Sequence, residues 1–271
     1  MTSQLPVGFA VATMPIAAGT ITTDAIGVDA REVTVQSAQF EMPAYQARPV
    51  GTGRFPVVLV VQEVFGVHEH IKDICRRLAK EGYLAIAPEL YARQGDASKF
   101  EDIQELIEKI VSKVSDEQVM ADLDATLEYA RSSRHADPER LGITGFCWGG
   151  RIVWLYAAHQ PRLKAAAAWY GRLVASPWPG DSERKQPVDV AADVMAPVIG
   201  LYGGKDGGIP LSTVEQMRTA LQAAGKNNCE FVVYPEAGHA FNADYRPTYH
   251  AASALDAWAK MLAWFKTYGV S

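Results

Sequence analysis

The residue with the strongest chemical signature is a cysteine inside a Gly-x-Cys-x-Gly segment. Cys147 has Gly145 and Gly149 on either side, follows the apolar run Leu141–Thr144 and precedes a helical pattern that begins at Trp148. This is the nucleophile-elbow pattern with sulfur in place of the usual hydroxyl. The glycines allow strand and helix to approach closely, and the start of a helix favours a thiolate. We expect Cys147 to attack a carbonyl carbon; the alternative is a small buried thiol, as most free cysteines are.

An acid and a histidine follow Cys147 in the order nucleophile, acid, histidine that elbow enzymes use. Asp206 comes after the apolar run Val198–Tyr202, and His239 comes after Glu230–Tyr234. An imidazole can take a proton near neutral pH and return it to a leaving group, while a carboxylate fixes its tautomer. We predict His239 as the base and Asp206 as its orienting acid. The alternatives are a loop histidine and an aspartate that caps a turn or helix.

The elements that would position these residues alternate along the chain, as they do in βαβ units. We predict strands at Glu32–Gln36, Val57–Gln62, Leu84–Ala87, Leu141–Thr144, Ala165–Trp169, Val198–Tyr202 and Glu230–Tyr234. We predict helices at Glu69–Lys80, Phe100–Val111, Asp116–Arg131, Trp148–His159, Ser212–Ala223 and Tyr249–Tyr268. Continuously apolar strands indicate a doubly wound, mostly parallel sheet with helices on both faces. Ligands of such sheets bind beyond the carboxyl ends of the strands, where all three candidates lie.

The composition is that of one globular domain. The chain has 271 residues, of which 48% are hydrophobic and 21% charged, and its net charge is -5. We predict an extended arm over residues 1–30 and one α/β domain over residues 31–271. The negative charge gives no reason to expect nucleic acid as a partner. No apolar run approaches the roughly 20 residues of a membrane span.

The cysteine count indicates a reducing compartment. The three cysteines have neither paired nor metal-binding spacing. No Lys or Arg precedes Arg31, so the basic start of a secretory signal is missing. We expect a cytoplasmic protein that acts on a small molecule without a cofactor, as a monomer or a small homo-oligomer.

Four stretches together resemble the dienelactone hydrolases (carboxymethylenebutenolidases), α/β-hydrolases with a Cys-His-Asp triad. They are Val61–Val67, Pro88–Gln94, Gly145–Gly150 and Ala237–Phe241. The resemblance extends over roughly residues 30–268. It implies an α/β-hydrolase fold and the hydrolysis of an ester or lactone bond.

The resemblance also assigns a role to a glutamate. In the family, a glutamate in the Gln-Glu-x-Phe-Gly segment contacts the resting thiol and helps to deprotonate it, which here is Glu63. A carboxylate at the end of an apolar strand beside the elbow could tune the thiolate. The alternative is a solvated or helix-capping acid. The N–H groups of Val64 and Trp148 are the expected oxyanion donors.

The substrate implied by the resemblance is a small carboxylated lactone whose carboxylate is held by two arginines. Arg93 matches the first of these. The second does not align cleanly, because the nearest arginine after His239 is Arg246, seven residues beyond it. Tyr91, Tyr170 and Phe241 are aromatic residues near strand ends that are expected to form either pocket wall or core.

Other functions and a metal site stay open at this stage. His68-Glu69-His70 could suggest a metal, but neighbouring helical positions point apart and no third ligand is evident, so we expect none. The triad could serve another ester, a thioester or a peptide. In a non-catalytic alternative, Cys147 would be oxidised in a binding or redox-sensing module.

Overall fold

A single mixed sheet forms the centre of the protein. The computed structural model describes residues 20–175 and 181–271, and within them eight strands form one sheet in the order β1-β2-β4-β3-β5-β6-β7-β8. The strands are β1 (Val28–Ser37), β2 (Phe40–Pro49), β3 (Phe55–Val61), β4 (Leu84–Pro88), β5 (Ala136–Phe146), β6 (Ala165–Trp169), β7 (Val198–Gly203) and β8 (Cys229–Tyr234). β2 is antiparallel to both of its neighbours, and the strands from β4 to β8 are parallel. The predicted doubly wound α/β-hydrolase sheet is confirmed.

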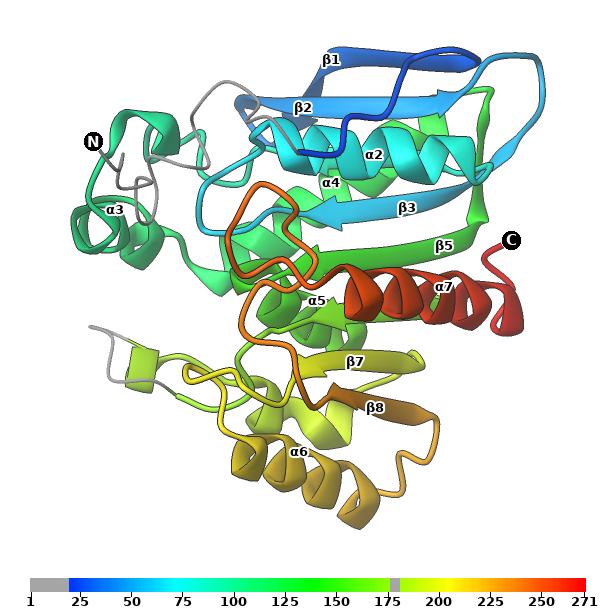
Figure 1. Cartoon of the computed structure of the whole chain (residues 1–271). Coiled ribbons are helices and arrows are strands. Elements are labelled where there is room, and N and C mark those ends of the chain that lie inside the picture. The colour runs from blue at the N-terminus through cyan, green and yellow to red at the C-terminus, as the bar shows by residue number, and fades with distance from the viewer. Residues whose placement is uncertain (1–19, 176–180) are drawn as a thin grey trace, which may run out of the picture.

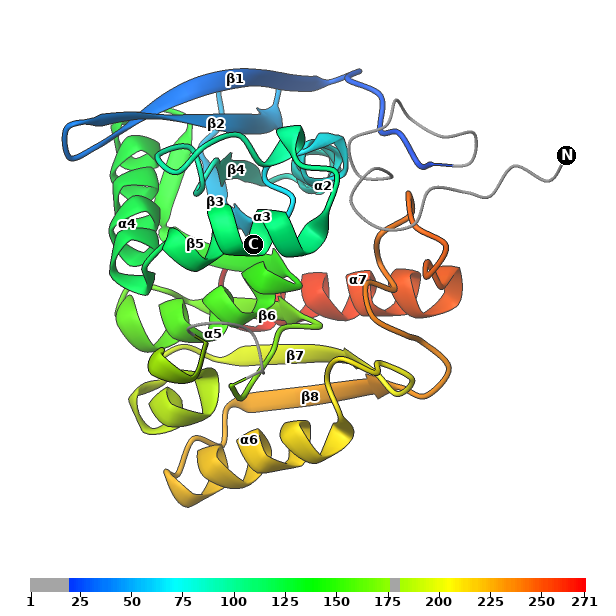
Figure 2. The ribbon, with the colours of Figure 1, turned by 90° about the vertical axis from the view of Figure 1, so that its left-hand side faces the viewer.

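Helices cover both faces of this sheet. They are α2 (Glu69–Lys80), α3 (Ile103–Lys109), α4 (Asp116–Ser132), α5 (Trp148–His159), α6 (Leu211–Ala223) and α7 (Ala251–Thr267), with short 3-10 helices η1 (Ala97–Lys99), η2 (Val111–Lys113), η3 (Asp181–Glu183) and η4 (Pro187–Asp193). Figure 2 shows α2 and α7 on one face and α4 and α5 on the other. α3 lies beyond the ends toward which the arrows of the parallel strands point (Figure 1). Within the described ranges, no helix is both long and apolar enough to span a membrane.

The largest difference from the sequence prediction is β2, which we did not predict. Its sequence contains Pro43 and Pro49, and proline cannot donate to a strand ladder. β2 nevertheless lies between two strands, because its pairing with β4 involves only Ala44–Ala47, between the two prolines. The predicted arm also differs at its end, since β1 already begins at Val28. Residues 1–19 of that arm lie outside the described residues.

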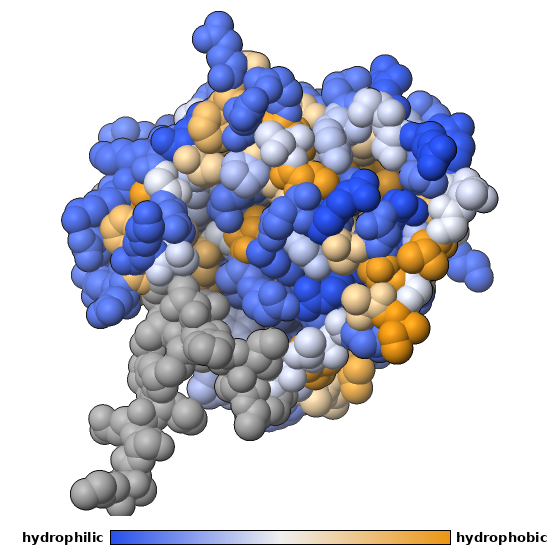
Figure 3. All heavy atoms as spheres, turned by 90° about the horizontal axis from the view of Figure 1, so that it is seen from above, coloured by the Kyte–Doolittle hydropathy of each residue, from blue (hydrophilic) through white to orange (hydrophobic). Residues whose placement is uncertain are grey.

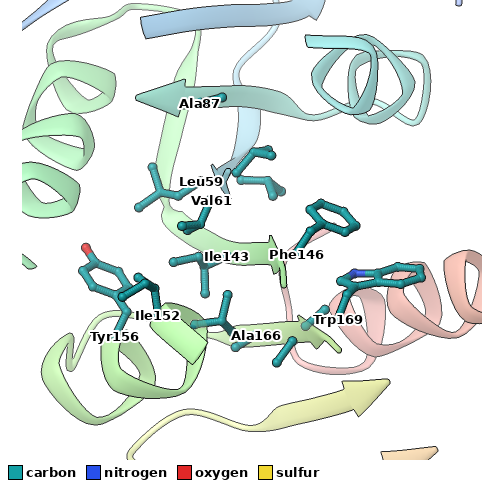
Figure 4. Packing of buried hydrophobic residues seen from close by; sticks show 14 of the residues in the cluster. Leu59, Val61, Ala87, Ile143, Phe146, Ile152, Tyr156, Ala166 and Trp169 are labelled. Carbon is teal, nitrogen blue, oxygen red and sulfur yellow. The ribbon is translucent and has the colours of Figure 1, made fainter. Parts of the chain in front are cut away.

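The core explains why the central strands are so apolar. All side chains of Val57–Val61 in β3 are completely buried, as expected when helices cover both faces. Figure 4 shows Ile152 and Tyr156 of α5 on one side of the central strands and Trp169 on the other. The edge strand β1 exposes charged residues instead, and the face beyond it is mostly hydrophilic (Figure 3). Charged edges of this kind protect a sheet from pairing with other chains.

Candidate active site

Cys147 lies at a strained turn between β5 and α5. It is the residue directly before α5 and has φ 56° and ψ -113°, a conformation that few residues other than glycine adopt. The turn requires glycine nearby: a Cβ on Gly145 would lie 2.5 Å from the carbonyl oxygen of Gly149, and one on Gly149 would lie 2.5 Å from those of Val61 and Gln62. The backbone therefore holds the thiol in one place at the end of the strand.

His239 and Asp206 complete a chain of contacts that begins at this thiol. His239 Nε2 lies 3.2 Å from Cys147 Sγ, and His239 Nδ1 lies 2.7 Å from Asp206 Oδ2. The other oxygen of Asp206 accepts hydrogen bonds from the N–H groups of Gly208 and Ile209, at 2.8 and 3.2 Å. The carboxylate is thus fixed from one side while it orients the imidazole from the other. The structure brings the three side chains together from loops after β5, β7 and β8.

Electrostatics favour the protonated form of His239. Burial alone would lower the pKa of the imidazole, but the negative charge of an ionised Cys147 and the hydrogen bond to Asp206 outweigh it and raise the pKa to about 10. The arrangement therefore stabilises an imidazolium beside the Cys147 sulfur. A thiolate is the nucleophilic form of cysteine.

Val64 and Trp148 each have a backbone N–H group without an acceptor in its own element. Val64 follows Glu63 in a tight turn in which the Gly66 N–H bonds to the Glu63 carbonyl, and among the described residues the Val64 N–H has no hydrogen-bond acceptor. Trp148 is the first residue of α5, where backbone N–H groups lack a partner within the helix. Both residues line the pocket around Cys147. Such donors can stabilise an oxyanion.

Glu63 is buried beside this centre but bonds elsewhere. One oxygen, Oε2, accepts hydrogen bonds from Tyr245 Oη at 2.6 Å and from His68 Nε2 at 3.1 Å, while Oε1 has no partner among the described residues. Burial opposes ionisation, but the hydrogen bond and charge of His68, with other cationic groups nearby, outweigh it and lower the pKa of Glu63 from 4.5 to about 2. The carboxylate is therefore ionised, and its hydrogen bonds do not include the thiol.

The sequence did not predict the ion pairs between α2 and the loop after His239. His70 Nδ1 lies 3.4 Å from Asp244 Oδ1, Asp244 also pairs with Arg77 of α2, and Arg77 Nε lies 2.6 Å from Asp73. These contacts tie the loop after His239 to α2. The two histidines considered for a metal thus serve carboxylates, and no metal-binding group of three His, Cys, Asp or Glu side chains occurs in the part of the chain that the structure describes.

The cavity in front of the thiol has a volume of about 290 Å³ and is mostly apolar. Cys147, His239 and Asp206 lie on its wall, together with Tyr170 and Arg246. Its size and its few convergent polar groups suit a small organic ligand.

Comparison with known proteins identifies the family of this chain. A family model described as the dienelactone hydrolase family matches residues 42–269. The chain belongs to the dienelactone hydrolase family. It is a hydrolase of that type, with the α/β-hydrolase fold.

Similar members of the dienelactone hydrolase family come from several bacteria. A Methylorubrum extorquens protein, provisionally named carboxymethylenebutenolidase, is 59% identical over 99% of this chain and 92% of its own length. A Bradyrhizobium protein, provisionally named 2-oxo-3-(5-oxofuran-2-ylidene)propanoate lactonase, is 33% identical over 82% of this chain and 88% of its own. The crystal structure of a provisionally assigned dienelactone hydrolase from Klebsiella pneumoniae matches with a TM-score of 0.84 at 59% identity, over 89% of this chain and 99% of that one.

One residue transferred from the family pattern is not where the resemblance implied. Arg93 was expected to bind the substrate carboxylate, but its Nη1 lies 2.5 Å from Asp122 Oδ2, and its guanidinium lies over the ring of Phe40. It does not line the cavity. In this structure Arg93 is instead paired with Asp122, on α4, a completely buried carboxylate that requires a cation.

Of the other residues expected to bind substrate, two line the cavity and two lie in the core behind it. Arg246 lines the cavity with its guanidinium 5.6 Å from the ring centre of Phe65, and Tyr170 lines it as well. Tyr91 is completely buried with its ring against Trp148, and Phe241 is completely buried behind Tyr170. Neither of these two lines the cavity. Tyr91 and Phe241 therefore support the site from behind.

Proposed function

We propose that this hydrolase opens an ester or lactone bond with Cys147 as its nucleophile. The observation that carries the proposal is the continuous chain from Cys147 Sγ through the His239 imidazole to Asp206, with distances of 3.2 and 2.7 Å. Its position at a strained elbow on the wall of an apolar cavity supports a catalytic rather than a structural thiol. The dienelactone hydrolase family supports the same class of bond.

The mechanism follows from these positions. The Cys147 thiolate adds to the carbonyl carbon, and the N–H groups of Val64 and Trp148 stabilise the oxyanion. The tetrahedral intermediate collapses as the C–O bond breaks, and the His239 imidazolium gives its proton to the departing alkoxide. Neutral His239 then takes a proton from water, which attacks the thioester. Collapse of this second intermediate releases the acid and restores the thiolate and imidazolium.

Glu63 has a tuning role in this proposal. Its charge is held by His68 and Tyr245, close enough to the site to influence Arg246 and the ionisation of Tyr170. A fixed negative charge beside the elbow affects when the thiolate is present. Glu63→Gln keeps an oxygen that can accept both hydrogen bonds but removes the charge. We expect a slower enzyme with a shifted pH profile; an unchanged profile would exclude this role.

The proposed substrates are small esters or lactones that carry a carboxylate. Arg246 supports this assignment because it is a half-buried cation on the cavity wall with no ion pair among the described residues. The name of the Bradyrhizobium relative describes a lactone that bears such a carboxylate. Guanidinium groups recognise carboxylates well.

The decisive experiment is intact mass measurement after brief exposure to an activated ester. We expect one acyl adduct on the wild type and on Cys229→Ala, a matched control at a half-buried cysteine outside the cavity. Cys147→Ala should fold, form no adduct and have no turnover. An adduct or wild-type turnover in Cys147→Ala would overturn the proposal, as would a thiol that takes up oxygen but never an acyl group.

A further inference from the structure

One wall of the catalytic cavity is a row of branched aliphatic side chains. Ile103, Ile107 and Val111 line the cavity and recur at every fourth residue along α3 and η2. This spacing places Ile103 and Ile107 on one face of α3, and Val111 is the first residue of η2. Both ribbon views place α3 in front of the carboxyl ends of the strands (Figures 1 and 2). We call these three residues the apolar row.

The apolar row is only partly covered by the protein. Ile107 and Val111 are 8% and 5% exposed, but Ile103 keeps 36% of its surface exposed. Leu106, beside Ile107 on α3, is completely buried in the core. Helices normally turn such side chains inward. An apolar ligand in the cavity would cover Ile103.

Two of the arginines that line the cavity are engaged by protein groups. Arg151 makes a bidentate ion pair with Asp116, both contacts being 2.8 Å, and also bonds to Gln186. Arg184 donates to the carbonyl oxygen of Ser112 at 2.8 Å and lies 3.9 Å from the same aspartate. The apolar row beside them suits hydrocarbon, whereas Arg246, which has no ion pair among the described residues, suits a carboxylate.

We propose that the apolar row binds a hydrocarbon chain of the ester substrate, so that the preferred substrates are anionic amphiphiles larger than a simple lactone. The inference rests on the proposed ester hydrolysis and deepens it. The seven residues of α3 span about 10 Å, which exceeds the size of a five-membered ring and matches a medium-length alkyl or aryl chain. Each methylene that leaves water for this wall strengthens binding by up to about fourfold.

The test compares esters that differ only in chain length. The first series is p-nitrophenyl acetate, butanoate, hexanoate and octanoate, and the second is alkyl hydrogen succinates with the same increments in the alcohol. We expect kcat/KM to rise about two- to fourfold per methylene in at least one series. A flat response in both series would overturn the inference while leaving ester hydrolysis intact.

A matched pair of variants assigns the effect to the apolar row. Ile103→Ser removes an exposed side chain, so the fold is preserved, and it should reduce the octanoate-to-acetate ratio of kcat/KM about fivefold. Leu255→Ser changes an exposed apolar residue on α7, outside the cavity, and should leave the ratio unchanged. Equal ratios in all three proteins would overturn the assignment.

A binding measurement separates this inference from the proposed function. Calorimetry on Cys147→Ala with butanoate, hexanoate and octanoate needs no turnover. We expect Kd to fall with chain length, and Ile103→Ser in the same background to remove most of that fall. If no ester is hydrolysed but this pattern appears, the proposed function fails and the apolar subsite stands. A Kd that does not depend on chain length refutes the subsite.

Discussion

Replacing Tyr245 by phenylalanine removes a single hydroxyl that donates a 2.6 Å hydrogen bond to the buried Glu63 carboxylate. Glu63 is 1% exposed, and only His68 would remain as a donor to its charged oxygen. A hydrogen bond to a charged group contributes about 1.5–3 kcal/mol. We therefore expect Tyr245→Phe to lower the free energy of unfolding by about 2 kcal/mol near pH 7.

The pH dependence of this loss has a definite sign. The pKa of Glu63 is about 2 in the folded chain and ordinarily 4.5, so its ionisation stabilises the fold above pH 4.5, and this contribution is lost as the pH falls toward 2. Loss of the Tyr245 donor should raise the pKa of Glu63 in the folded chain, since a hydrogen bond to the carboxylate favours its ionised form. The difference between variant and wild type should therefore shrink as the pH falls from 4.5 to 2.

Urea unfolding of both proteins over a series of pH values measures this difference. Tyr83→Phe is the matched control, because Tyr83 is 5% exposed and makes no side-chain hydrogen bond among the described residues. It should have nearly wild-type stability. A loss for Tyr245→Phe below about 0.5 kcal/mol, or one of the same size at every pH, would refute a hydrogen bond to an ionised Glu63.

Three further results are expected. Gly149→Ala should lower the free energy of unfolding in urea by about 3 kcal/mol or more, because the added Cβ would lie 2.5 Å from two backbone oxygens. In the control Gly207→Ala, the added Cβ has no atom within 4 Å, so the free energy of unfolding should change little. Arg93→Ala should lower the free energy of unfolding by about 2–4 kcal/mol, because it leaves the buried carboxylate of Asp122 on α4 unpaired. KM for carboxylated esters should be unchanged. A raised KM with unchanged stability would instead assign Arg93 to the substrate carboxylate. His239→Asn should slow alkylation of Cys147 about tenfold or more near pH 7, because an ordinary thiol is only a few per cent thiolate there; equal rates would contradict the ion pair.

Local sequence signals predicted the elements best where propensity and burial agree. The bounds predicted for the helices Glu69–Lys80 and Trp148–His159 and for the strand Ala165–Trp169 are those of the structure. β2 was missed because its two prolines argue locally against a strand, while its place in the sheet depends on pairing both with β1 and with β4, which is about 40 positions away. Propensity acts over a few residues, whereas strand pairing is decided by the whole sheet.

In the candidate site too, local features could be predicted from the sequence and contacts between distant residues could not. The order of Cys147, Asp206 and His239, each after a strand, could be predicted because parallel strands bring their carboxyl ends to one edge. The partners of Glu63 could not, since Tyr245 is 182 positions away in the chain and reaches it only through the path of the loop after His239. The ion pair of Arg93 could not be predicted for the same reason: its motif is local, but the carboxylate that it contacts belongs to α4.

The sequence by itself determined the kind of chemistry, because the glycines around Cys147 and the apolar strands before each polar candidate are local requirements of an elbow and a parallel sheet. Only the tertiary structure decided which charged side chains lie in contact with one another. It places an arginine against a buried carboxylate instead of in the cavity, holds Glu63 between a histidine and a tyrosine, and turns the apolar row toward the thiol. Charge pairing and cavity shape depend on distances between elements remote in sequence, and those distances are fixed only when the helices pack on the sheet.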